Sequence, residues 1–202
     1  GQGDGSILSA SDGLVMNITT IVGTNRKGSM SLHIGRKIQK IYETLNINAK
    51  LIDLQALPAE LFQPTAYKEK PTAFQPFQEI ILESAGLHFI VPEYNGSYPG
   101  ILKYFIDMWK YPDSFENRCV TYTGVAAGQW GGLRSVEHLQ GVMGYRNAYQ
   151  FNERVFINNI YSRWDWETSK IKKLQEKEFD VEELLQSQVK NFVEFCRVHQ
   201  PK

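Results

Sequence analysis

A polar loop between two regular segments carries the residues best suited to bind a phosphate group. It reads TNRKGSMS from Thr24 to Ser31, with hydroxyl side chains at positions 24, 29 and 31 and a planar cation at Arg26. A helix that begins after this loop offers unpaired backbone N–H groups and the positive end of its dipole. A nucleoside-triphosphate loop is disfavoured, because Ser29 stands where its lysine is required. We predict a cradle for one terminal phosphate; the alternative is an ordinary turn with a serine cap and a solvated arginine.

A second loop, from Pro92 to Gly100, has the residues to hold a flat ligand. It reads PEYNGSYPG, so two prolines restrict its shape and two tyrosines supply aromatic faces. The alternative is a rigid connector whose tyrosines pack on neighbouring residues. Ser97 also suggests a hydrolase nucleophile, but that motif needs glycine two residues before and after the serine, where Asn95 and Pro99 stand. Hydrolase chemistry is therefore disfavoured.

A third loop, at 123–132, reads TGVAAGQWGG and is rich in glycine. Its four glycines and two alanines allow the backbone to come close to the edge of a ligand. The alternative is a flexible crossover loop, because glycine content alone is a weak signal.

The elements that must position these loops alternate between strand and helix. Apolar residues recur at helical spacing from Met30 to Leu45, and the run LHFIVP at 87–92 is typical of a strand buried on both faces. We predict strands at 15–22, 47–54, 87–92, 119–122 and 148–157, and helices at 30–45, 74–85, 99–109, 133–143 and 181–196. This order indicates an α/β fold, a five-stranded parallel sheet with helices on both faces, in three layers. All three loops then follow strands, at the edge where such sheets bind ligands.

Composition narrows the class of protein. The 202 residues suit one domain, predicted at 14–202, after a flexible tail or cloning scar at 1–13. Lys plus Arg and Asp plus Glu each total 22, and this balance disfavours a nucleic-acid partner. No apolar run reaches the ~18 residues of a membrane span, so we expect no membrane partner and a cytoplasmic location. Two cysteines far apart, with four scattered histidines, give no disulfide framework and no metal site.

Taken together, the three loops resemble those of the NADPH-dependent FMN reductase family, flavodoxin-like proteins that include quinone, azo and chromate reductases. The resemblance spans roughly residues 15–145 and, more loosely, the C-terminal helix. The first loop fits the family's G-S-x-R-x-x-S pattern with threonine for serine, and the third ends in the family's Gly-Gly-Leu-Arg. The family signature P-E-Y-N-x-S-x-P-G-x-L-K-x-x-x-D is matched by Pro92, Glu93, Tyr94, Asn95, Ser97, Pro99, Gly100, Leu102, Lys103 and Asp107.

The resemblance implies a flavodoxin-like fold with bound FMN. The first loop would hold the phosphate, while the second and third would flank the isoalloxazine. The implied cofactor-binding residues are Thr24, Arg26, Ser29, Met30, Ser31, Pro92, Glu93, Tyr94, Asn95, Gly96, Ser97, Ala127, Gly128, Gln129 and Gly131. No side chain is implied as a catalyst, because the flavin N5 itself takes a hydride from NAD(P)H.

The predicted function is therefore an FMN-dependent NAD(P)H oxidoreductase that passes two electrons to a small-molecule acceptor. Quinones, azo dyes, nitro compounds, metal oxyanions and free flavin are all open as acceptors. Family members are dimers or tetramers, so we expect a homodimer or homotetramer. One alternative is a non-enzymatic electron carrier resembling flavodoxin, and another is a binding module for a phosphorylated small molecule without redox chemistry.

Overall fold

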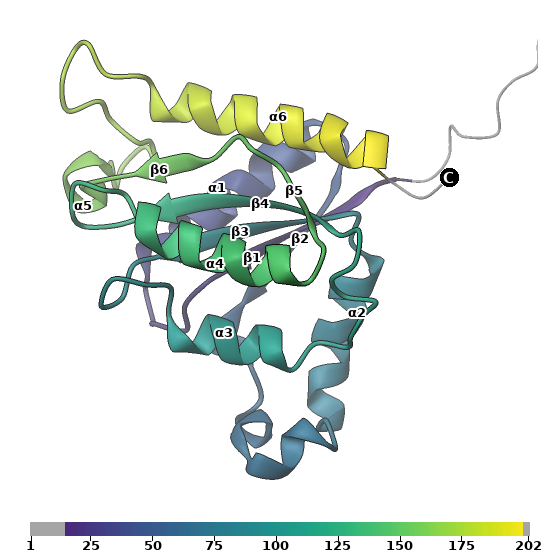
Figure 1. The fold of residues 1–202 in the computed structure, drawn as a ribbon. Helices are drawn as coiled ribbons and strands as arrows, with labels where there is room; N and C mark the ends of the chain where they lie inside the picture. Colours follow the sequence, from purple (N-terminus) through teal and green to yellow (C-terminus); the bar gives the residue numbers. More distant parts are fainter. Residues whose placement is uncertain (1–14, 200–202) are drawn as a thin grey trace, which may run out of the picture.

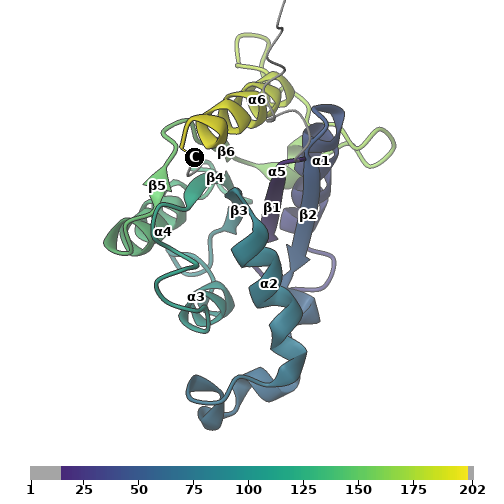
Figure 2. The ribbon, with the colours of Figure 1, turned by 90° about the vertical axis from the view of Figure 1, so that its right-hand side faces the viewer.

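The computed structural model describes residues 15–199, in which one parallel sheet lies between two layers of helices (Figures 1 and 2). The strands are β1 (Asn17–Val22), β2 (Asn48–Asp53), β3 (Gly86–Pro92), β4 (Cys119–Val125), β5 (Tyr149–Gln150) and β6 (Val155–Ile157). The sheet order is β2-β1-β3-β4-β5, and β6 also pairs with β4. The predicted parallel α/β sheet is confirmed. The predicted tail at 1–13 lies outside the described residues.

The last predicted strand, 148–157, is interrupted. Its first part, β5, pairs with the start of β4, and β6 pairs with the end of β4, both in parallel. Between them, the buried amide of Gln188 donates hydrogen bonds to the carbonyl oxygens of Tyr122, at 2.8 Å, and Glu153, at 3.2 Å. The side chain of Gln188, which is distant in the sequence, thus replaces backbone hydrogen bonds between the strands and divides the last strand into β5 and β6.

The helices divide between the two faces of the sheet (Figure 2). Helices α1 (Met30–Thr44) and α6 (Val181–His199) pack in one apolar core, while α2 (Gln75–Glu83), α3 (Gly100–Asp107) and α4 (Leu133–Tyr145) pack in the other. Strands β3 and β4 are buried along their whole length, as expected where both faces are covered. The short helix α5 (Ile160–Arg163) was not predicted.

The stretch between β2 and α2, for most of which no strand or helix was predicted, contains short 3₁₀ helices. They are η1 (Leu54–Ala56), η2 (Ala59–Phe62), η3 (Pro64–Tyr67) and η4 (Thr72–Phe74). A proline stands directly before η2 and η4 and at the first position of η3. The N-terminus of a helix tolerates proline, because the backbone N–H group that proline lacks has no partner within the helix there. None of the helices within 15–199 has the length and apolar character to cross a membrane.

Candidate functional site

The three loops meet at the carboxyl ends of β1, β3 and β4, beside α5 (Figure 1). Together they enclose a cavity of about 100 Å³, here called the three-loop cavity. Its lining residues are Arg26, Ser29, Met30, Ser31, Pro92, Glu93, Tyr94, Val125, Ala126, Ala127, Ile160 and Tyr161. Whole-ligand pockets usually measure about 300–1,000 Å³, so this cavity suits a group the size of phosphate. The remainder of a larger ligand would have to extend over the exposed loops at its mouth.

The first loop ends in the serine cap that belonged to the alternative interpretation of this loop. The Ser29 hydroxyl accepts a hydrogen bond from the Leu32 N–H group at 3.2 Å, and its side chain is buried. Helix α1 begins at Met30, directly beside the cavity. No partner within residues 15–199 accepts a hydrogen bond from the N–H groups of Met30 and Ser31. These two donors and the dipole of a 15-residue helix therefore face the cavity without a protein acceptor.

Arg26 supplies the positive charge of the site. Its guanidinium donates a hydrogen bond to the Tyr161 hydroxyl at 2.8 Å, and this bond raises the pKa of the arginine above its ordinary value. In the described part of the chain, no carboxylate lies within ion-pair distance of Arg26. Its charge is thus held at the cavity by a neutral phenol and is available to an anion.

The second loop is built on a two-residue turn. Asn95 and Gly96 adopt positive φ angles of 52° and 79°, as the two central residues of a type I′ turn require. The N–H group of Tyr94 donates to the Ser97 carbonyl at 2.8 Å, and the N–H group of Ser97 donates back at 3.2 Å. Residues 15–199 offer no acceptor to the N–H groups of Asn95 and Gly96. The turn is therefore rigid and presents two backbone donors to a ligand.

Side-chain contacts tie this turn to its surroundings. The Tyr94 hydroxyl lies 2.6 Å from the Thr24 hydroxyl, which joins the first loop to the second. On the other side, the Ser97 hydroxyl lies 2.8 Å from Nδ1 of His138. A Cβ atom placed on Gly96 would lie 3.3 Å from a guanidinium nitrogen of Arg134, so this exposed cation sits beside the turn.

The glycines of the third loop serve packing more than ligand approach. Gly131 and Gly132 have φ angles of 59° and 81°. A Cβ atom on Gly131 would lie 3.0 Å from the backbone of Phe156 and Ile157, on the adjoining strand β6. Only Ala127 of the four predicted residues in this loop lines the cavity. Gly128 and Gln129 are exposed, and Gly131 is buried against β6.

The structure thus brings together about half of the predicted site around one cavity. The predicted residues that line it are Arg26, Ser29, Met30, Ser31, Pro92, Glu93, Tyr94 and Ala127. Those outside its lining are Thr24, Asn95, Gly96, Ser97, Gly128, Gln129 and Gly131. Val125, Ala126, Ile160 and Tyr161 were missed. Val125 and Ala126 belong to the third loop, four of whose other residues were predicted. Ile160 and Tyr161 could have been inferred from the predicted last strand, because that strand also ends at this edge of the sheet.

Of the four histidines, one is deeply buried. His88 lies between the Tyr42 hydroxyl and the Thr123 hydroxyl, each at 2.8 Å. Burial lowers its pKa to about 3, so the ring is neutral and has a structural role in the layer of α1 and α6. Within residues 15–199, no group of three His, Cys, Asp or Glu side chains could hold a metal ion.

Comparison with known proteins agrees with this geometry. A sequence model of the family described as NADPH-dependent FMN reductase matches residues 16–162. The quinone reductase of Escherichia coli strain K12 is 27% identical over 150 residues, which cover 72% of this chain and 78% of that protein. The 2-hydroxy-1,4-benzoquinone reductase of a Burkholderia species is 24% identical over 156 residues, covering 75% and 84%.

A solved structure shares the fold. FerB, described as a flavoenzyme NAD(P)H:(acceptor) oxidoreductase from Paracoccus denitrificans, superposes with a TM-score of 0.72 at 22% identity. The alignment covers 92% of this chain and 99% of that one.

Proposed function

Because this chain belongs to the NADPH-dependent FMN reductase family, an oxidoreductase family that uses FMN and NAD(P)H, we propose that it binds FMN across the three loops and reduces a small quinone. When bound, FMN would supply the redox chemistry, namely two-electron transfer between NAD(P)H and the acceptor. The protein's own part is to hold, orient and expose the flavin.

The phosphate end of the proposal rests on one observation above all. The three-loop cavity combines Arg26, which has no carboxylate partner in the described chain, with the open N–H groups of Met30 and Ser31. A cation and helix N-terminal donors around a space of about 100 Å³ match the chemistry of a phosphate monoester. The residues present therefore fit the phosphate of FMN.

The isoalloxazine would lie outside this cavity, against the second loop. The turn at Asn95 and Gly96 offers backbone donors to the polar edge of the ring system, and the third loop, from Ala127 to Gly131, would border the other side. The rigidity of the turn supports this assignment, because a preformed donor pair loses little entropy when the ligand binds. We assign no catalytic side chain.

Quinones are the first choice of acceptor among the candidates. The relatives from E. coli and Burkholderia are named quinone reductase and 2-hydroxy-1,4-benzoquinone reductase. Azo, nitro, metal-oxyanion and free-flavin acceptors remain secondary choices, since exposed loops around a flavin select weakly by size. The competing function, a flavodoxin-like electron carrier, is disfavoured because the family match covers 16–162 and includes all three loops.

Assembly and location belong to the same proposal. Exposed Tyr111 and Tyr145 border a groove of about 500 Å³ along α3 and α4, and the Arg146 guanidinium lies over both rings. Tyrosine and arginine are enriched at protein interfaces, which supports a homodimer or homotetramer. Buried Cys119 and Cys196 are in side-chain contact with each other and form no disulfide, which fits a reducing compartment and thus the cytoplasm.

Steady-state kinetics of the FMN-loaded protein test the function. We expect NADPH or NADH oxidation that depends on added 1,4-benzoquinone and saturates with it. A protein that binds FMN and oxidises neither nucleotide with any of the five acceptor classes would refute the reductase assignment and favour the carrier. A protein that cannot be loaded with FMN would refute the cofactor assignment itself.

A further inference from the structure

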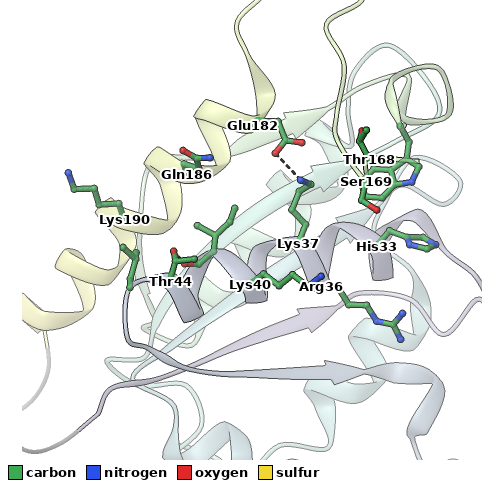
Figure 3. Close-up of a pocket in the computed structure, with 13 residues that line it drawn as sticks. His33, Arg36, Lys37, Lys40, Thr44, Thr168, Ser169, Glu182, Gln186 and Lys190 are labelled. Carbon is green, nitrogen blue, oxygen red and sulfur yellow. Dashed lines mark hydrogen bonds and ion pairs between the residues drawn. The ribbon is translucent and has the colours of Figure 1, made fainter. Parts of the chain in front are cut away.

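A second cavity lies on the face of the molecule covered by α1 and α6, away from the three loops (Figure 3). It measures about 810 Å³, within the usual range for ligand pockets, and is here called the α1/α6 groove. Its lining residues are His33, Arg36, Lys37, Lys40, Ile41, Thr44, Leu45, Trp164, Thr168, Ser169, Glu182, Gln186 and Lys190. None of them lines the three-loop cavity. Helix α5 separates the two sites, with Tyr161 at one and Trp164, just after the helix, at the other.

The α1/α6 groove is basic, although the whole chain carries no net charge. Its only acidic lining residue, Glu182, forms an ion pair with Lys37 at 2.8 Å, which joins α6 to α1 across the groove (Figure 3). Arg36, Lys40 and Lys190 also line it, and none has a carboxylate within 4.0 Å in the described part of the chain. A concave surface with three uncompensated cations concentrates anions.

One end of the groove is aromatic. The ring of His33 lies 5.6 Å from the ring of Trp164 and 5.3 Å from that of Trp166. Trp166 is 65% exposed, so its indole offers a free face beside the mouth of the groove. Along α1, Lys40 lies seven positions after His33, which corresponds to about 10 Å at the usual helical rise. Lys40 is therefore about two helical turns from the aromatic end, and Arg36 lies between them.

We propose that the α1/α6 groove binds a nucleoside di- or triphosphate. The base would lie against His33 and the exposed Trp166 beside the mouth of the groove, and the phosphate chain would extend along α1 toward Lys40 and Lys190. A ligand of this class carries a flat ring at one end and several negative charges at the other, which matches the aromatic rings and the cations of the groove. The groove is separate from the FMN site, so this ligand is neither the flavin nor the electron acceptor, and the proposal stands apart from the reductase assignment.

Isothermal titration of the full-length, FMN-saturated protein with ATP, at low ionic strength and without Mg²⁺, tests the proposal. We expect one ATP per chain. The pair Lys40→Gln with Lys190→Gln should weaken binding at least tenfold, because two phosphate contacts are lost. The matched control pair, Lys68→Gln with Lys177→Gln, removes the same charge from exposed positions outside the groove and should change affinity less than twofold.

Two further titrations separate the parts of the ligand. Trp166→Ala should weaken ATP binding and leave the binding of inorganic tripolyphosphate unchanged. The same titration of the FMN-free protein should give the same ATP affinity. Failure of ATP to bind, equal weakening in both lysine pairs, or ATP binding that occurs only without FMN would overturn the proposal. Equal affinity for tripolyphosphate and ATP would overturn the assignment of the base.

Discussion

Replacing Arg26 with alanine tests the proposed phosphate site most sharply by mutation. The side chain is exposed, has no carboxylate partner in the described chain and makes one side-chain hydrogen bond, to Tyr161. A hydrogen bond between an arginine and a phosphate is worth about 1.5–3 kcal/mol. Since 1.4 kcal/mol corresponds to a factor of ten, Arg26→Ala should weaken FMN binding roughly 10- to 150-fold. Folding stability should change by less than about 0.5 kcal/mol, as is usual for an exposed residue.

The assay is quenching of flavin fluorescence during titration of the FMN-free protein, repeated at two salt concentrations. Lys27→Ala is the matched control, because Lys27 is the adjacent exposed cation of the same loop and does not line the cavity. Its effect should be small and should vanish at about 1 M salt, where the screening length falls to about 3 Å. If Arg26→Ala leaves the affinity unchanged, or if the two variants lose affinity equally, the arginine does not bind the phosphate.

Three further perturbations follow from the same structure. Gly131→Ala should lower the free energy of unfolding in urea by about 1–3 kcal/mol, because alanine is strained at the positive φ of this position. The control Gly128→Ala should be neutral, because a Cβ atom at Gly128 would have no neighbour within 4 Å. Equal effects of the two substitutions would contradict this explanation. Ser29→Ala should cost about 1 kcal/mol in the same assay through loss of the helix cap, and an unchanged midpoint would show that the cap is unimportant. The ion pair with Arg163 holds the pKa of Glu178 at about 2, below its ordinary 4.5. The ion pair therefore stabilises the fold above pH 4.5, and this contribution is lost as the pH falls toward 2. In Glu178→Gln, the free energy of unfolding should depend less on pH over that interval. An unaltered pH dependence would refute the pairing.

The general position of the site followed from local sequence patterns. The apolar run of β3 and the helical spacing from Met30 to Leu45 identify these elements without tertiary information. Burial on both faces gives the strand a continuous apolar run, and burial of one face gives the helix its period. Once the elements alternate, a parallel sheet places their loops at one edge. For this reason Arg26, Glu93 and Ala127, one from each predicted loop, line a common cavity.

The rest depended on contacts between distant parts of the chain. Tyr161 meets Arg26 across 135 positions, from a helix of four residues that is too short to show a period. Gln188 splits the last strand through bonds to backbone 35 and 66 residues away. Part of the reason for glycine at Gly131 also lies in another element, since the close approach of β6 adds to the constraint of its positive φ.

A crystal structure of the protein with bound FMN tests the central claim most directly. The account predicts that the phosphate lies in the three-loop cavity, within hydrogen-bond distance of the backbone N–H groups of Met30 and Ser31 and of the Arg26 guanidinium. A phosphate located anywhere else on the molecule, or a flavin that avoids the loops altogether, would contradict it.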